Sequence, residues 1–223
     1  MSTSSPLQID IISDFVCPWC FIGKRKLDIA LNAPRDFEIN IIWRPYRLDP
    51  SIPFEGVDRK QYLEAKFGVS GAQKIGEKVS SAAGGTGIQF DFAAIQRSPN
   101  TTNAHRLTRW AGIMGRQHQI ADALFTAYFE QGRDIGNIET LCDIGVEIGF
   151  DRQELVEALA SNADFDTIDS QDAQARDAGV TGVPAFLLGG KFVLMGAQDP
   201  DYLSNIFAKA HERLAPSSDE AAS

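Results

Sequence analysis

Cys17-Pro18-Trp19-Cys20 places two cysteines three positions apart. A turn-like stretch over residues 13–16 separates them from residues 7–11, where apolar and polar side chains alternate as in a strand. Pro18 favours the first turn of a helix, where its missing N–H group is not needed. Three residues of helix advance by about 4.5 Å along the axis. Because a disulfide needs Cα atoms roughly 4.4–6.8 Å apart, the spacing predicts a pair that opens and closes reversibly.

The two cysteines are expected to have different roles. The unpaired N–H groups and the dipole of a helix N-terminus stabilise a thiolate on the first cysteine, so Cys17 is the candidate nucleophile. Cys20 lies one turn further into the helix. We therefore expect Cys20 to be less exposed and to resolve a mixed disulfide by attacking Cys17.

Two other uses of such a pair fit the sequence less well. A structural disulfide between residues so close together closes a very small loop and restrains the unfolded chain little. Zinc requires four ligands, but a second Cys-x-x-Cys is missing and His105, His118 and His211 lack finger-like spacing. Redox chemistry is favoured, and no metal site is predicted.

Composition narrows the choice of partners. The chain has 223 residues, with 21 Lys and Arg against 30 Asp and Glu, which gives a formal net charge of −9. This balance argues against nucleic acid, because phosphate binding needs clustered positive charge. No secretory signal and no run of about 18 apolar residues are found, so we expect no membrane association and a cytoplasmic location.

The predicted elements form a β-α-β unit, a helical middle and a terminal β-β-α unit. A strand over residues 37–44 follows the helix that begins at the cysteine pair. Gly189-Gly190 is expected to join strands over residues 183–188 and 191–194 in a two-residue turn. In the helical middle, a break is predicted near Gly68, and Asn137 and Asp151 are predicted to cap helices. This middle is longer than a crossover helix needs, which predicts an inserted helical subdomain.

Val183-Pro184 opens the first strand of that hairpin. Proline cannot donate a hydrogen bond to a neighbouring strand, so its presence at the start of a strand calls for a structural explanation. A cis Val183–Pro184 bond would turn the chain sharply and leave the backbone of Val183 free to pair with an extended peptide. An ordinary trans proline entering an edge strand is the alternative.

This order of elements resembles the thioredoxin fold, and within it the DsbA-like thiol–disulfide oxidoreductases, over residues 7–210. Stretches 13–20, 43–50 and 100–107 extend the resemblance to the cytoplasmic FrnE-like subgroup. The resemblance implies an α/β, thioredoxin-like fold with a large all-helical insertion. The expected parts are a discontinuous thioredoxin-like domain (1–50 and 166–213), an inserted helical domain (51–165) and a disordered tail (214–223).

The resemblance also implies how the site works. Cys17 attacks, Cys20 resolves, and a cis Pro184 faces the disulfide. The implied partners are protein or peptide thiols and disulfides, together with a cellular thiol reductant or oxidant. No tightly bound cofactor is expected, and glutathione is a candidate co-substrate. The expected substrate-binding residues are Pro18, Trp19, Val183 and Pro184.

Three further residues are weaker candidates for the substrate cleft. Asp14 lies just before the cysteine pair and would either relay protons or raise the thiol pKa. Asn100 and His105 belong to a stretch that resembles the family, although a lone histidine is more often a packed or capping residue.

Other reactive or charged residues have simpler interpretations. Cys142, on a predicted helix, is expected to be a buried small apolar residue. The basic residues 24–26 and the acid-rich stretch 151–172 are expected to form solvated surface.

Two other functions are kept as alternatives. Hydroxychromene-carboxylate isomerases and kappa-class glutathione transferases share the inserted-helix layout and use glutathione. They typically place Ser at the position of Cys17 and lack a resolving cysteine, whereas this chain has both cysteines. A peptide-binding holdase, with redox activity incidental, is the remaining alternative.

Overall fold

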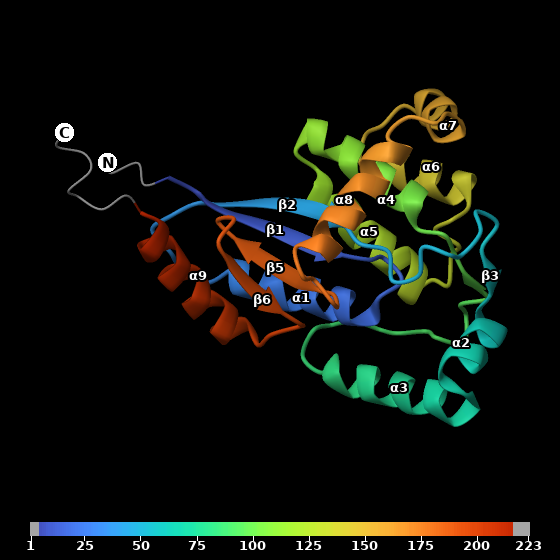
Figure 1. Ribbon diagram of the computed structural model, residues 1–223, viewed down its shortest axis with the longest axis horizontal. Helices are drawn as coiled ribbons and strands as arrows, with labels where there is room; N and C mark the ends of the chain where they lie inside the picture. Colours follow the sequence, from blue (N-terminus) through green and yellow to red (C-terminus); the bar gives the residue numbers. More distant parts are fainter. Residues whose placement is uncertain (1–4, 216–223) are drawn as a thin grey trace.

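The computed structural model describes residues 5–215, and its centre is a four-stranded sheet (Figure 1). β1 (Leu7–Ser13) pairs in parallel with β2 (Ile39–Pro45) and antiparallel with β5 (Ala185–Leu188), which pairs antiparallel with β6 (Phe192–Met195). The strand order is therefore β2-β1-β5-β6. Both ends of the sequence supply this sheet, as the predicted thioredoxin-like fold requires.

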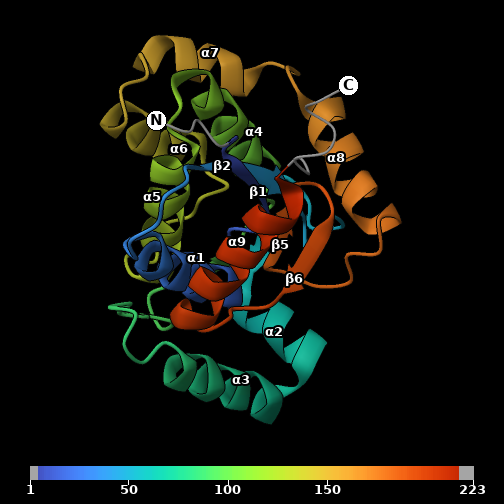
Figure 2. The same ribbon diagram turned by 90° about the vertical axis from the view of Figure 1, so that its left-hand side faces the viewer.

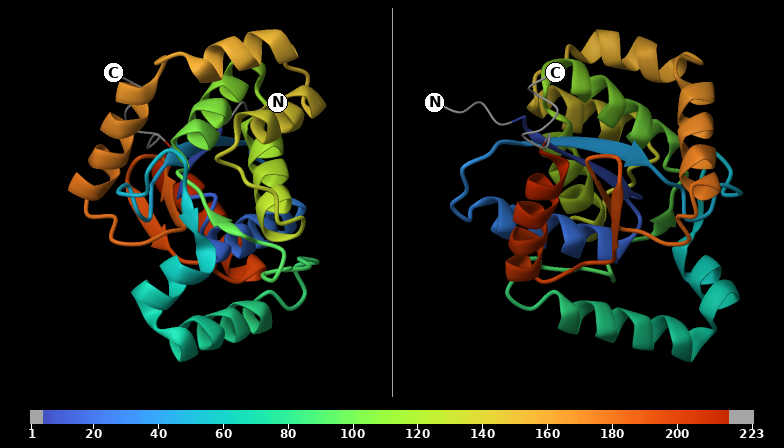
Figure 3. Two further views of the ribbon diagram at one scale, coloured as in Figure 1. Left: turned by 90° about the vertical axis from the view of Figure 1, so that its right-hand side faces the viewer. Right: turned by 60° about the vertical axis from the view of Figure 1, so that its left-hand side comes forward.

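Helices cover both faces of the sheet. α1 (Pro18–Leu31) and α9 (Pro200–Leu214) pack against each other on one face (Figure 2). The sheet separates them from α8 (Phe165–Asp177), which contacts β2 (Figure 3). No helix among residues 5–215 is long and apolar enough to cross a membrane.

The segment between β2 and α8 is mostly helical, as predicted. It also contains a 3-10 turn, η1 (Gly112–Met114), and a small sheet of β3 (Val57–Asp58) and β4 (Arg97–Ser98). The first two helices separate at Gly68, whose φ of 71° lies in the left-handed region that favours glycine. The helices are α2 (Arg59–Phe67), α3 (Val69–Ala82), α4 (Thr102–Ala111), α5 (Gln117–Phe129), α6 (Ile138–Glu147) and α7 (Arg152–Ala160).

The insertion and the thioredoxin-like part share one hydrophobic core. Phe21 of α1 stacks on Phe125 and Phe129 of α5, with ring centroids 5.3 and 6.0 Å apart, and all three side chains are completely buried. A smaller cluster joins Ile12 of β1 to Ala175 of α8. The predicted domain limits at 50 and 166 stay predictions, and this core continues across them.

Two details differ from the sequence interpretation. Asp10, placed by alternation on a polar face of β1, is 4% exposed and accepts hydrogen bonds from Arg44 (2.6 Å) and Gln8 (2.7 Å). It is covered because β1 is an inner strand buried on both faces. α9 reaches Leu214, the first residue of the predicted tail, and residues 216–223 of that tail lie outside the described residues.

Candidate active site

β1 ends directly before the cysteine pair. Ser13 is its last residue, and the N–H group of Cys17 donates to the Asp14 carbonyl at 3.1 Å, which closes a tight turn. Cys17 is the N-cap of α1 in an extended conformation (φ −92°, ψ 110°), and Pro18 takes the first helical position. The first turn of α1 contains no acidic residue, so no carboxylate offsets the helix dipole beside Cys17.

Both thiols of the pair are free and buried. Cys17 is 4% exposed and Cys20 is 1% exposed, so Cys20 is the deeper of the two, as predicted, by a small margin. Burial raises the pKa of the Cys20 thiol well above its usual value, and the neighbouring Cys17 thiol raises it further. The Ser13 hydroxyl and the Asp14 backbone beside Cys20 lower this pKa only in part. Cys20 therefore keeps its proton at neutral pH.

The Val183–Pro184 loop lies against the cysteine pair. The Val183–Pro184 peptide bond is cis, as the resemblance implies. The Cys17 Sγ donates a hydrogen bond to the Val183 carbonyl at 3.6 Å, across 166 positions of sequence. Gly23 of α1 approaches the same loop so closely that a Cβ there would lie 2.9 Å from the Pro184 Cγ.

The predicted substrate-binding residues differ in exposure. Pro184 is buried, whereas Pro18, Trp19 and Val183 are half-buried. Each half-buried side chain keeps part of its apolar surface open to solvent beside Cys17. This rim can contact an apolar side chain of a bound peptide.

Asp14 and His105 come together beneath this surface. Asp14 is 1% exposed, and its Oδ2 accepts a hydrogen bond from the Leu48 N–H group at 2.8 Å. Its Oδ1 lies 3.5 Å from the Nε2 of His105, which belongs to α4 and is 4% exposed. The His105 ring packs against Phe15 with centroids 4.9 Å apart.

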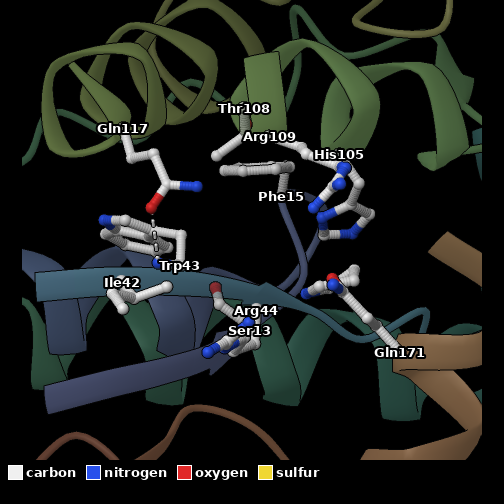
Figure 4. A pocket seen from close by; sticks show the side chains of 11 residues that line it. Ser13, Phe15, Ile42, Trp43, Arg44, His105, Thr108, Arg109, Gln117 and Gln171 are labelled. Carbon is white, nitrogen blue, oxygen red and sulfur yellow. Dashed lines mark hydrogen bonds between the residues drawn. The ribbon is translucent and has the colours of Figure 1, made fainter. Parts of the chain in front are cut away.

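A cavity of about 90 Å³ lies between β2 and the helices α4, α5 and α8 (Figure 4). Ser13 and His105 both line it, and Gln117 and Gln171 add side-chain amides. The Gln117 Oε1 accepts a hydrogen bond from the backbone N–H group of Trp43 at 3.0 Å. The cavity therefore reaches the active-site turn through Ser13.

Comparisons with known proteins place the chain in a family. A family model described as the DSBA-like thioredoxin domain matches residues 8–208. The chain belongs to this family. It is 29% identical over 216 residues to the uncharacterized protein YwbO of Bacillus subtilis (strain 168), an alignment that covers 92% of this chain and 95% of YwbO.

Solved structures show the DsbA-like fold over nearly the whole chain. A probable DsbA oxidoreductase from Streptomyces coelicolor is similar with a TM-score of 0.85 and 26% identity, over 95% of this chain and 93% of that chain. A 2-hydroxychromene-2-carboxylate isomerase has a TM-score of 0.66 and 19% identity, over 97% of this chain and 100% of that chain. The second similarity is one of fold.

Within the DsbA-like site, Asn100 makes two backbone contacts. Its side-chain N–H group donates to the Ile52 carbonyl at 2.7 Å, and its Oδ1 accepts from the Thr102 N–H group at 2.9 Å. These bonds fix the chain ahead of α4, the helix that carries His105. A direct role for Asn100 in the cleft stays a prediction.

The predicted solvated surfaces are wrong at two positions. Lys24 is 5% exposed and pairs with Asp28 and Asp122, because α1 packs against α5. Asp172 is 4% exposed and accepts a hydrogen bond from the Arg47 N–H group at 2.9 Å. It is covered because α8 packs beside β2 and the loop that follows.

The third cysteine stands apart from the DsbA-like site. Cys142 is completely buried in α6, as predicted, and burial raises the pKa of its thiol. Within the described part of the chain, no three His, Cys, Asp or Glu side chains gather in a way that could hold a metal ion.

Ser13 and Gly23 were not predicted as site residues. Gly23 could have been found by its spacing, because positions i and i+3 of a helix share a face and Cys20 lies three residues earlier. Ser13 is the last residue of the strand that leads to the cysteines, and no local pattern distinguishes its hydroxyl.

Proposed function

We propose that this DsbA-like protein is a thiol–disulfide oxidoreductase that exchanges disulfides with protein or peptide thiols through Cys17 and Cys20. One observation carries the proposal. Cys17 is the N-cap residue of α1, and its thiol contacts the carbonyl of Val183, next to a cis proline, while the buried Cys20 lies three residues further along α1.

The first step is attack by Cys17 on a substrate disulfide. The Cys17 thiolate forms a bond to one substrate sulfur, and the other substrate sulfur leaves as a thiolate. The helix N-terminus supports the negative charge on Cys17 before attack. The half-buried Trp19 and Val183 border the position of the mixed disulfide and contact the peptide that carries it.

The second step is resolution by Cys20. Its sulfur attacks the Cys17 sulfur, the Cys17–Cys20 disulfide forms, and the substrate leaves as a thiolate. The two enzyme cysteines are oxidised and the substrate disulfide is reduced. With an oxidised enzyme and a reduced substrate, the same steps run in reverse.

The proposed partners follow from this chemistry. Protein or peptide thiols and disulfides are the substrates, and a small thiol such as glutathione returns the site to its starting state. We place the chain in the cytoplasm, where thiol reductants are abundant, because Cys142 is left without a structural disulfide partner.

A glutathione-dependent isomerase is the main alternative, since one such enzyme shares the fold. Cys20 favours the exchange function, because an isomerase needs no resolving thiol. Glutathione-dependent isomerisation that tolerates loss of Cys20 would favour the isomerase. Suppression of aggregation that tolerates loss of both cysteines would favour a holdase.

Serine substitutions test the exchange function. We expect Cys17→Ser to reduce exchange with a model peptide disulfide to the uncatalysed rate, because an alcohol is a poor nucleophile toward sulfur. Cys20→Ser should retain the first step and accumulate mixed disulfides, which mass spectrometry of the trapped species identifies.

Cys142→Ala is the matched control, since it removes the one thiol outside the site. It should leave the exchange rate unchanged. Exchange that survives Cys17→Ser, or that fails equally in Cys142→Ala, would show that the pair does not carry the activity.

A further inference from the structure

Three buried polar atoms, at the end of β1, in the turn that follows it and on α4, lack a hydrogen bond of good geometry. They are the Ser13 Oγ, the Asp14 Oδ1 and the His105 Nε2, on residues no more than 4% exposed. Buried polar groups are nearly always paired, so a group of unpaired ones near reactive thiols calls for an explanation. Movement of a proton among these three atoms would explain why they are unpaired.

The position of Ser13 connects Cys20 to His105. The Ser13 hydroxyl lies beside the Cys20 thiol and also lines the cavity of about 90 Å³ to which His105 contributes. Such a cavity is large enough for water, and Ser13, His105, Gln117 and Gln171 offer the polar partners that water needs.

The other charged groups that line this cavity are already paired. Arg44 of β2 lies 2.6 Å from Asp10, and Arg109 of α4 lies 3.1 Å from Asp164. Arg47, which bonds to Thr102 at the start of α4, pairs with Asp169 and Asp172 of α8. Asp14 and His105 are therefore left facing each other at 3.5 Å.

Cys20 has to lose a proton before it can resolve a mixed disulfide, because the thiolate is the attacking species. Its burial opposes that loss. A nearby acceptor that is itself shielded from solvent would take the proton without opening the site.

We propose that the Asp14–His105 pair accepts the Cys20 proton in the resolving step, and that Ser13 and the cavity carry the proton between them. The inference rests on the proposed function. A bond forms between the sulfurs of Cys17 and Cys20, the bond from Cys17 to the substrate sulfur breaks, and the substrate leaves as a thiolate. The Cys20 proton passes to the pair, and no further oxidant is required.

The inserted helices hold the acceptor in place. His105 lies on α4, and its ring is fixed against Phe15, while the Leu48 N–H group holds the other oxygen of Asp14. The insertion thus supplies one half of the acceptor and the β1–α1 turn supplies the other half.

A two-phase reaction separates this inference from the proposed function. Dithiobis-nitrobenzoate is an aromatic disulfide whose released thiolate is coloured, so stopped-flow absorbance follows both steps. Attack by Cys17 releases the first coloured thiolate, and resolution by Cys20 releases the second. In His105→Gln the first phase should be unchanged, and the second should slow at least about tenfold near neutral pH, because a positioned base typically contributes more than that.

The pH profile distinguishes proton transfer from packing. As the pH rises from about 6 to about 9, hydroxide takes over the role of the acceptor, so the second phase of His105→Gln should recover toward that of the unaltered protein. Equal slowing of the second phase at every pH, or equal slowing of both phases, would overturn the inference.

Two more variants complete the test. His118→Gln is the matched control, since His118 of α5 forms a second, more exposed histidine–aspartate pair with Asp28 of α1, and it should alter neither phase. Ser13→Ala removes a hydroxyl whose polar neighbour is the Cys20 thiol and which has no other hydrogen-bond partner, so the fold should persist even where His105→Gln does not fold. A normal second phase in Ser13→Ala would overturn the relay. Absence of a first phase in the unaltered protein would instead refute the proposed function.

Discussion

Gly23 shows how little room the active site leaves for one additional atom. It lies in the interior of α1, where glycine is unfavourable, yet a Cβ at this position would meet the Pro184 ring at 2.9 Å. The benefit of glycine here is close contact between the helix of the cysteines and the cis-proline loop.

We expect Gly23→Ala to slow disulfide exchange. The added methyl pushes Pro184 away and displaces the Val183 carbonyl from the Cys17 thiol. Alanine gains about 1 kcal/mol in helix propensity, but overpacking costs about 1–3 kcal/mol, so the free energy of unfolding should fall slightly. Urea unfolding and exchange kinetics measure the two effects.

Gly76→Ala on α3 is the matched control. A Cβ at Gly76 would find its nearest neighbour, in Phe92, at 3.9 Å, an ordinary contact. This variant should gain about 1 kcal/mol and keep full activity. A similar gain and full activity in Gly23→Ala would show that the close approach has no functional importance.

Residue-level predictions succeeded where the partner is near in sequence. Asn137 and Asp151 cap their helices as predicted, by accepting from N–H groups three residues later. The predictions failed for Lys24 and Asp172, which are buried and have partners 98 and 125 positions away. The sequence around a charged helical residue predicts its neighbours within the same helix. It does not predict which distant element packs over that residue.

At the scale of elements, Arg106 joins α4 to the end of α7. Its guanidinium is completely buried and donates to the carbonyls of Ala158, Leu159, Ser161 and Ala163. It therefore satisfies carbonyls that the end of a helix leaves unpaired. The same helix α4 carries His105, so this contact also positions the active site.

Arg106→Lys should destabilise the protein by about 2–5 kcal/mol, because an ammonium lacks the planar fork and each buried carbonyl left unpaired costs about 1–3 kcal/mol. Urea denaturation measures the loss. Arg109→Lys, one turn later and 45% exposed, is the control and should change stability by less than about 1 kcal/mol. Equal effects in the two variants would contradict the proposed link.

Element types were largely predictable, because periodicity, caps and glycine turns are local signals. The hairpin turn at Gly189 and Gly190, with φ of 54° and 70°, and the break at Gly68 lie where the sequence predicts them. The predicted two-residue loop is wrong in length, because Leu188 pairs with Phe192 and the loop therefore has three residues. The β3–β4 pair was not predicted, because two residues in each strand are too short a pattern for periodicity to detect.

At the scale of the whole molecule, a group of charges joins α1 to the insertion. Asp28 of α1 bonds to Lys24 and to His118 of α5, the latter at 2.6 Å. Burial alone would raise the pKa of Asp28, but the hydrogen bonds from His118 and Lys24 outweigh burial and lower it.

This lowered pKa predicts an acid-sensitive contribution to stability. A carboxyl with a lower pKa in the folded state stabilises the fold above its unfolded pKa, and the contribution is lost as the pH falls through the folded pKa. Asp28→Asn should cost about 1–2 kcal/mol at neutral pH. The difference should begin to shrink as the pH falls below about 4, the unfolded pKa, and should vanish once the pH is below the lowered folded pKa. Urea unfolding of Asp28→Asn and of the unaltered protein across this pH range checks the prediction. A difference in the free energy of unfolding that does not depend on pH would refute the prediction.

The architecture was predictable from element order, because the cysteine pair and Val183-Pro184 lie at opposite ends of the sequence with helices between them. The contact between Asp14 and His105 was not. It depends on how α4 docks against the β1–α1 turn, and that orientation is set by packing among residues such as Phe15 and Phe125, whose rings lie 5.2 Å apart.

The shared aromatic core has a consequence for modularity. Phe21 directly follows Cys20 in α1, and its two stacking partners belong to the insertion. A shortened chain without residues 51–165 would expose the Phe21 ring. It would also lose His105 and the helices that pack around it. The inserted helices are therefore an integral half of the redox unit, and the two parts should melt in one cooperative transition.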